Sequence, residues 1–460
     1  MKKTYIARTL AIFLTASVIL GGCGSVKGTA TTASDTGAVE TTVSQNASAS
    51  GKAAAGNGSE ASAANGDTQT AESSKGTSSG STGESTAAAD IFTERDLQQE
   101  ADLTNAVTYT VADNQDITIS AEGVYVISGT AKECSIIVDA DSSEKVQLVL
   151  DGVNITNKDT PAIYVKSADK VFVTTTDSTN QLTVTGSFTE DGDTNTDAVI
   201  FSKDDLVLNG VGSLTISSTD NGISCKDDLK ITGGTYTVTS TSDAFEANDS
   251  ISICGGTINI NSQKDGLHSE NDEDDTVGSV YISGGTINID AAKNGIRATT
   301  TLTVDGGALD IDAAEGLEST QVEINDGTIN IVAADDGINA GQKSDAYDIV
   351  LTFNGGNTTI NMGQGDTDAI DSNGDLYING GTIDITAQFA FDFDGVGQMT
   401  GGNVTVNGQT VTQLTNSMMG GGGRGGAPQG GFGGEGGMAS GGEAGMGPGG
   451  KGGRAPGNSI

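Results

Sequence analysis

Two groups of acidic residues recur at equivalent positions of neighbouring sequence repeats, at a spacing that could gather carboxylates around a metal ion. If the repeats stack as adjacent strands, equivalent side chains lie about 4.8 Å apart, and like charges repel there unless a cation lies between them. Carboxylate oxygens without thiolates favour a hard ion, so we predict Ca²⁺; the alternative is a solvated acidic face. The predicted ligands are Asp243, Glu246, Asp265 and Glu270 in the first group and Asp366, Asp368, Asp371, Asp392 and Asp394 in the second.

The alignment of the repeats also predicts which of these residues stack on one another. In the first group, Glu246 aligns with His268, the single histidine of the chain, and in the second group Asp371 aligns with Asp392. A lone histidine among carboxylates is most often their hydrogen-bond partner, so we predict that role for His268.

The elements that would position these side chains come from one motif repeated through the centre of the chain. Each copy has two alternating apolar segments around a glycine pair, as in Val280-Tyr-Ile-Ser-Gly-Gly-Thr-Ile-Asn-Ile289, followed by a third short segment such as Asn294-Gly-Ile. Alternation places Ile, Val and Leu inside and Thr, Asn and Asp outside, and the glycines allow tight turns. We therefore predict an all-β fold, a right-handed single-stranded parallel β-helix with three short strands per ~22-residue coil.

The segments on either side of the repeats do not favour a packed core. Residues 1–22 look like a bacterial lipoprotein signal, because a basic start and a short apolar run end in Leu-Gly-Gly-Cys23. We expect Cys23 to be lipidated and to hold the exported protein at the outer face of the cell membrane. Residues 23–89, rich in Ser, Thr, Ala and Gly, are predicted to be a flexible linker, and the Gly-rich tail 418–460 is also expected to be disordered. This leaves 90–417 as the β-helix domain.

The charge of the chain restricts the partners of this domain. Asp and Glu number 61 against 22 Lys and Arg, a formal net charge of −39, and the acidic excess lies in the repeat region. Phosphate backbones need clustered Lys and Arg, so nucleic acid is excluded as a partner. Cations and neutral ligands remain, whereas an anionic uronate chain would bind mainly through bridging Ca²⁺. We expect a monomer that contacts the membrane only through its lipid anchor.

Three segments of the repeat region carry a family resemblance. They are Ile136-Ile-Val-Asp-Ala-Asp141, Val146-Gln-Leu-Val-Leu-Asp-Gly-Val-Asn-Ile-Thr156 and Gly365-Asp-Thr-Asp-Ala-Ile-Asp-Ser-Asn-Gly-Asp375. With them, the chain resembles the calcium-binding, carbohydrate-binding β-helix lipoproteins of Gram-positive bacteria. The resemblance implies a pectate-lyase-like fold, bound Ca²⁺ and the binding of polysaccharides such as cellulose or polygalacturonate, without established lyase activity.

Three functions stay open at this point. A polysaccharide-binding module for neutral glucans would need aromatic platforms, and in a chain without Trp the candidates are Tyr236, Tyr281 and Tyr377. A calcium-dependent polysaccharide lyase would need a basic residue beside the ion, and Lys264 and Arg297 lie near the first acidic group. A structural adhesin is the third. We favour binding without catalysis.

Overall fold

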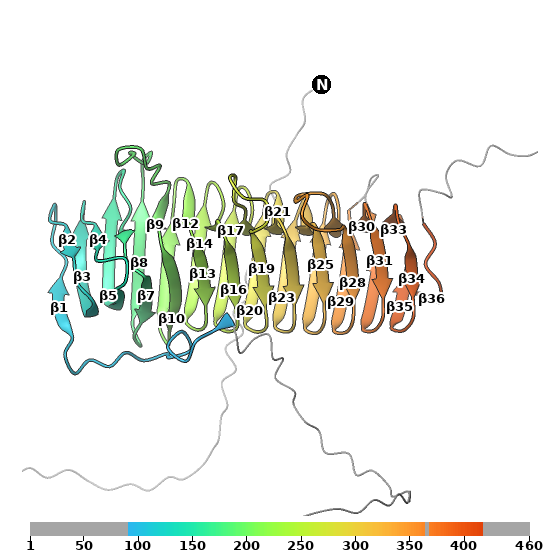
Figure 1. Ribbon diagram of the computed structural model, residues 1–460, viewed down its shortest axis with the longest axis horizontal. Helices are drawn as coiled ribbons and strands as arrows, with labels where there is room; N and C mark the ends of the chain where they lie inside the picture. Colours follow the sequence, from blue (N-terminus) through green and yellow to red (C-terminus); the bar gives the residue numbers. More distant parts are fainter. Residues whose placement is uncertain (1–90, 364–367, 417–460) are drawn as a thin grey trace, which may run out of the picture. The chain divides into compact units, whose positions relative to one another are not determined.

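The computed structural model describes residues 91–363 and 368–416, and the strands of these ranges form two sheets (Figure 1). The small sheet has 12 strands and the large sheet has 24. From Ile163 onward along the chain, one strand of the small sheet is followed by two of the large sheet, and these three strands make one coil; before Ile163, each strand of the small sheet is followed by one longer strand of the large sheet. Each strand pairs in parallel with the equivalent strand of the next coil, so the coils stack in a β-helix-like arrangement. The structure thus confirms the predicted all-β class with parallel strands.

The small sheet contains one strand from each coil. Its members in chain order are β2 (Ile117–Ile119), β4 (Ile136–Asp139), β6 (Ile163–Ser167), β9 (Ala198–Ser202), β12 (Asn221–Cys225), β15 (Phe245–Ala247), β18 (Leu267–Ser269), β21 (Asn294–Ala298), β24 (Glu315–Ser319), β27 (Ile338–Ala340), β30 (Asp368–Ser372) and β33 (Phe389–Phe393).

The large sheet begins with three strands and then runs as two rows. The first three are β1 (Val107–Thr110), β3 (Gly123–Lys132) and β5 (Lys145–Asn157). One row is β7 (Lys170–Thr175), β10 (Asp205–Gly210), β13 (Asp228–Ile231), β16 (Ser250–Ile253), β19 (Ser279–Ile282), β22 (Thr301–Val304), β25 (Gln321–Ile324), β28 (Val350–Phe353), β31 (Asp375–Ile378) and β34 (Gly397–Met399). The other row is β8 (Thr179–Val184), β11 (Ser213–Ser217), β14 (Thr235–Ser240), β17 (Thr257–Ser262), β20 (Thr286–Ala291), β23 (Ala308–Ala313), β26 (Thr328–Ala333), β29 (Asn357–Met362), β32 (Thr382–Thr386), β35 (Asn403–Val406) and β36 (Gln409–Val411). The last pair, β35 and β36, is antiparallel, which the repeat did not predict.

The core consists mainly of aliphatic side chains, with some aromatic ones, that stack in columns inside the coils. In the small sheet, Phe245, Leu267 and Ile296 are successive register partners, and all three side chains are fully buried. Each coil buries the apolar face of its neighbour, so the stack is stabilised by nearest-neighbour contacts. Alternation along a strand then leaves the intervening side chains on the outer faces.

The glycine pairs form the corners between the two rows of the large sheet. The second glycine of a pair has a positive φ, for example +95° at Gly285, where a side chain would be strained. The first glycine lies against the preceding coil, and a Cβ on Gly284 would meet the carbonyl oxygen of Cys254 at 2.5 Å. Both positions therefore require glycine, for different reasons.

A segment before the first strand, residues 91–100, packs against the outer side of the large sheet; we call it the strap (Figure 1, blue). The side chain of Asp96, a residue of the strap, is fully buried. It lies 3.6 Å from Lys170 Nζ and 4.0 Å from Lys230 Nζ. Thr232 Oγ1 donates to the Asp96 carbonyl oxygen at 2.5 Å. The strap therefore joins strands of successive coils, and nothing in the repeat predicted it.

Several expectations concern residues outside the described ranges. They are the lipoprotein signal, Cys23, the linker, the Gly-rich tail and Asp366. Nowhere in residues 91–363 and 368–416 is there a helix with the length and apolar character of a membrane span.

Candidate functional site

A column of outward-facing side chains follows the middle of the small sheet. In β15, for example, Phe245 and Ala247 point into the core and Glu246 between them is half-buried at the surface. Register pairs give the members of the column as Tyr164, Phe201, Ser224, Glu246, His268, Arg297, Glu318, Asn339, Asp371 and Asp392. The column therefore runs from aromatic side chains through paired charges to acids, and the predicted stacking of Glu246 on His268 and of Asp371 on Asp392 is observed.

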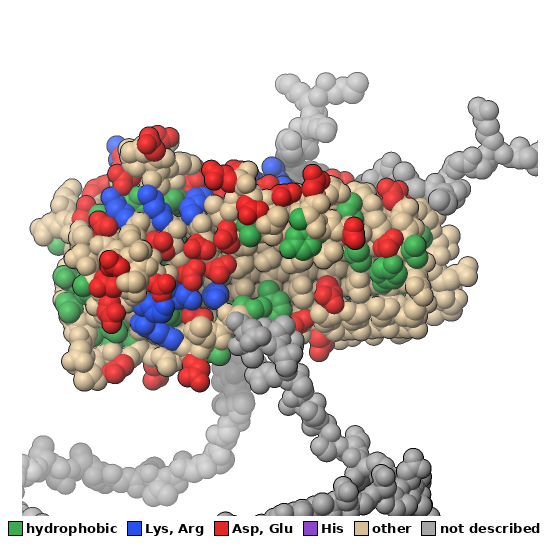
Figure 2. All heavy atoms as spheres, in the orientation of Figure 1, with side chains coloured by type: hydrophobic (Ala, Val, Ile, Leu, Met, Phe, Trp, Pro, Cys, Tyr) green, Lys and Arg blue, Asp and Glu red, His purple; other side chains and the backbone are tan. Residues whose placement is uncertain are grey.

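A groove of about 780 Å³ opens over the first part of this column. On the face in Figure 2, Lys and Arg side chains gather over the earlier strands and are interleaved with acids. Side chains with hydrogen-bonding groups line the whole groove. They are Asn195, Asp197, Asp220, Asn221, Lys226, Ser242, Asp243, Glu246, Asn248, Lys264, His268, Glu270, Asn271, Asp272 and Glu273.

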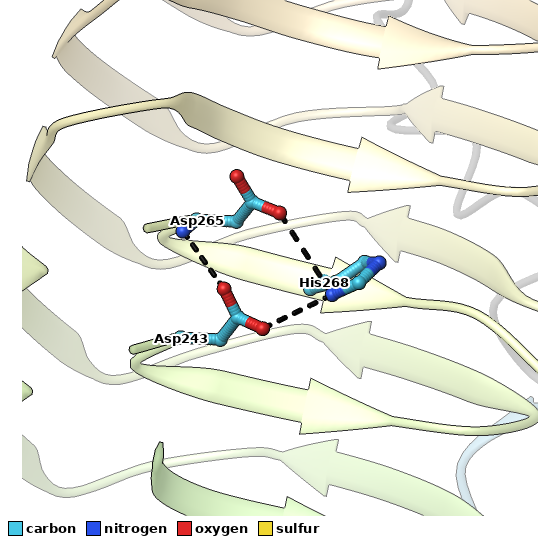
Figure 3. Close-up of side chains that lie close together, drawn as sticks. All are labelled: Asp243, Asp265 and His268. Carbon is cyan, nitrogen blue, oxygen red and sulfur yellow. Dashed lines mark hydrogen bonds and ion pairs between the residues drawn. The ribbon is translucent and has the colours of Figure 1, made fainter. Parts of the chain in front are cut away.

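Three of the predicted residues meet at the buried end of the groove (Figure 3). Asp243 and Asp265 precede β15 and β18, and the backbone N–H of Asp265 donates to Asp243 Oδ1 at 2.9 Å. The ring of His268 lies between carboxylates: Nδ1 is 3.2 Å from Asp243 Oδ2 and 3.8 Å from Asp265 Oδ2, and Nε2 is 2.8 Å from Glu270 Oε2. His268 is thus the hydrogen-bond partner that the sequence predicted.

The carboxylates around His268 determine its protonation. Burial alone would lower the pKa of the imidazole, but hydrogen bonds to Asp243 and Glu270 outweigh it and raise the pKa to about 9. Conversely, burial would raise the pKa of Asp243, but the contacts with His268 and the Asp265 N–H lower it overall. At neutral pH this cluster therefore holds an imidazolium between carboxylates.

The two basic residues of the groove are also held by its acids. Lys264 Nζ donates to Asp243 Oδ2 at 3.0 Å, and Lys226 Nζ lies 3.5 Å from Glu246 Oε1. Glu246 Oε2 accepts a second bond, of 2.6 Å, from Asn221 Nδ2. Polar side chains that bond one another in this way are fixed in position before any ligand arrives.

The first group of predicted ligands fits Ca²⁺ poorly. Asp243 Oδ2 already accepts from Lys264 and faces the imidazolium of His268, so a calcium ion would have to displace both cations. Glu246 is turned toward Asn221 and Lys226 rather than toward Asp243. The chemistry of these donors is that of an ion-pair network.

Among the described residues, Asp371, Asp392 and Asp394 of the second group have no basic partner, although the carboxylates of this group do not converge as Asp243, Asp265 and His268 do. Asp371 and Asp392 are register partners, and no ion pair within residues 91–363 and 368–416 involves either of them or Asp394. Burial, together with the charges of Asp336, Asp392, Asp368 and Asp394, raises the pKa of Asp371 to about 7. These uncompensated oxygen donors are a set that Ca²⁺ could use.

Several groove residues were missed by the sequence argument. Asp197, immediately before β9, has a pKa raised to about 6 by burial and by the charge of Glu246. Its Oδ2 accepts from Asn195 Nδ2 at 2.9 Å, while its buried Oδ1 has no hydrogen-bond partner among the described residues. The sequence did contain a signal for Asp197: an Asp also stands immediately before the next strand of the small sheet, where Asp220 precedes Asn221.

Of the three tyrosines suggested as sugar platforms, Tyr236 and Tyr281 are corrected, whereas Tyr377 is half-buried and donates its hydroxyl to Asp375 at 2.8 Å. Tyr236 is fully buried in the core, because its position in β14 faces inward. Tyr281 is 9% exposed and donates its hydroxyl to Asp305 at 2.8 Å. Tyr164 and Phe201 instead form an edge-to-face pair beside the groove, with Lys226 Nζ 5.7 Å from the Phe201 ring centre.

A family match and one relative both point to a carbohydrate-binding family, and one solved structure is also similar. A relative from Acetivibrio thermocellus, described as a carbohydrate-binding domain-containing protein, is 40% identical over 124 residues, which are 26% of this chain and 43% of that protein; the match thus spans less than half of the relative. A solved structure described as a polysaccharide lyase-like protein from C. thermocellum, in a gadolinium derivative, is 32% identical with a TM-score of 0.44, over 49% of this chain and 96% of that one. The profile of one family matches residues 113–369, more than half of the chain. The chain therefore belongs to the family of carbohydrate-binding domain-containing proteins.

Proposed function

We propose that this protein is an exported lipoprotein, anchored through Cys23 at the outer face of the cell membrane, that binds polysaccharide with a right-handed parallel β-helix. The groove on the small sheet is the binding site. The observation that carries this assignment is its lining, in which hydrogen-bonding side chains face a space of about 780 Å³. Sugars present hydroxyl groups that both donate and accept, so such a lining is complementary to them.

The rigidity of the lining supports a binding role. Asn221 bonds Glu246 through Nδ2 and accepts the Asp243 N–H at 2.9 Å through Oδ1. Because these side chains stand on paired strands and hold one another, little side-chain freedom is lost when a ligand binds.

The protonation of the groove favours binding over a lyase. To act as a general base, His268 or Lys264 must first be deprotonated. His268 is engaged through both ring nitrogens and has a raised pKa, and although burial would lower the pKa of Lys264, its bond to Asp243 raises it overall. Both groups are therefore held as cations.

The proposal assigns calcium to a site outside the groove. Asp368, Asp371, Asp392 and Asp394, at the later strands, would hold Ca²⁺, which would supply positive charge between adjacent coils. In the groove itself, the excess of acids favours a neutral glucan of the cellulose type over polygalacturonate unless calcium bridges the carboxylates.

Binding to immobilised glycans, measured with calcium and again with chelator, tests the proposal. We expect a polysaccharide to bind the wild-type chain and Asn248→Ala, which removes a groove amide, to weaken binding about tenfold or more. Asn330→Ala, on the outer face of β26, is the matched control and should bind as the wild type does. Absence of any glycan binding, or equal binding by the two variants, would refute the groove as a polysaccharide site.

A further inference from the structure

The groove contains more acids than its own basic groups can neutralise. Each basic group is already paired: Lys226 with Glu246, Lys264 with Asp243, and His268 with both Asp243 and Glu270. Four lining acids remain, and none of them forms an ion pair within the part of the chain that the structure describes. They are Asp197, Asp220, Asp272 and Glu273. The unliganded groove therefore carries negative charge that a ligand could balance.

Asp197 is the unpaired acid with a hydrogen-bonding position that no described residue fills. Its Oδ1 is buried without a hydrogen-bond partner among the described residues, and only Asn195 bonds Oδ2. A buried acceptor without a donor is unfavourable, so a ligand that brings a donor gains the bond at little cost. The terminal torsion of an Asp side chain is broad and nearly two-fold, so a small rotation can turn either oxygen toward the groove.

Asp220 supports the same conclusion from the neighbouring coil. Burial and the charge of Glu246 raise its pKa, as they do for Asp197. Asp272 and Glu273 extend the acidic lining along the exposed loop that follows β18. The acids therefore line more than one side of the groove.

The class of sugar that fits this charge differs from a uronate. A uronate would add a carboxylate to an acidic groove, and a neutral hydroxyl would satisfy Asp197 without balancing its charge. A protonated amine does both, since charge-assisted hydrogen bonds are the stronger ones. We propose that the groove binds an amine-bearing polysaccharide of the glucosamine type, with Asp197 accepting from the ammonium group. This rests on the proposed function and names its ligand class.

Titration calorimetry at about pH 6.5, where both the ionised Asp197 carboxylate and the protonated sugar amine are populated, tests the proposal with three hexasaccharides of matched length: glucosamine, N-acetylglucosamine and galacturonate. We expect the wild-type chain to bind the glucosamine oligomer at least ~10-fold more tightly than the other two. The preference should shrink as ionic strength rises from ~0.05 to ~0.3 M.

Substitutions of single acids test which residue is responsible for the preference for glucosamine. Asp197→Asn should abolish the preference for glucosamine and leave binding of the N-acetylated oligomer within about twofold. Asp310→Asn, exposed in β23 of the large sheet, is the control and should keep the preference. Asp272→Asn, in an exposed loop, is a second groove variant that cannot disturb the core and should weaken the preference.

The possible results distinguish a failure of the amine preference from a failure of polysaccharide binding itself. Binding of the N-acetylated or a neutral oligomer as tightly as glucosamine would overturn the amine preference and leave the polysaccharide site standing. Tighter binding of galacturonate in the presence of Ca²⁺ would overturn it in favour of a bridged uronate. A wild-type chain that binds no glycan would refute the proposed function itself.

Discussion

Glu246 of β15 is the register partner of His268 of β18, but the two side chains bond different neighbours. Glu246 accepts from Asn221 and Ser224 on the preceding strand, whereas His268 bonds Asp243 and Glu270. The charged column thus divides into local networks rather than one continuous chain. Because Asn221 bonds Glu246 and also accepts the Asp243 N–H, substitutions in one network should be coupled to substitutions in the other and not strictly additive.

Substitution of the histidine tests the first network. His268→Asn should lower the free energy of unfolding by about 2–4 kcal/mol, because it leaves the buried Asp243 with Lys264 as its remaining cation. Urea unfolding at pH 7 measures the change. A double variant with Asp243→Asn should lose much less than the sum of the single losses, and strict additivity would contradict the coupling.

Glu315 is one of several acids whose folded state prefers the proton, which makes the free energy of unfolding depend on pH. Burial, followed by the charges of Glu318 and Asp336, raises the pKa of Glu315 from 4.5 to about 7. The folded state then binds more protons than the unfolded state between these values, so stability falls as pH rises through this window and levels off above it.

Glu315→Gln removes this titration. We expect the variant to match the wild type near pH 4.5 and to be more stable by about 1–2 kcal/mol at pH 8, a figure reduced because the group is partly exposed. Thermal unfolding of both proteins across this range measures the difference. A constant difference between them at every pH would argue against a raised pKa at this residue.

The sequence predicted the parts of this structure that depend on periodicity. Alternation and the glycine pairs are local features, so they were sufficient to infer parallel stacking, the core faces and the register of Asp371 with Asp392. The strap was not predictable, because Asp96 and Lys230 are brought together by no repeated pattern. Nor were the pairings of Lys264 with Asp243 and of Asn221 with Glu246, which depend on side-chain rotamers and not on stacking alone.

The strap should depend on its buried acid. Asp96→Asn leaves Lys170 and Lys230 without the carboxylate between them, so we expect residues 91–100 to detach locally at a cost of about 2–4 kcal/mol. Hydrogen exchange and limited proteolysis of the segment measure this opening. Glu94→Gln, an exposed change in the same segment, should leave protection unaltered, and equal protection in the two variants would show that Asp96 does not hold the strap.

Calcium should act at the later strands and not at His268. With Ca²⁺ in about hundredfold excess over its dissociation constant, the wild type should gain about 2.7 kcal/mol, seen as a higher Tm that chelator reverses. Asp371→Asn should remove most of this gain and, without Ca²⁺, should be more stable than the wild type, because it relieves repulsion between Asp371 and Asp392. Asp265→Asn, in the first acidic group, is the matched control and should retain the full calcium response. If the response persisted in Asp371→Asn and disappeared in Asp265→Asn, the ion would lie beside His268, and the cations paired there would have to be displaced on binding.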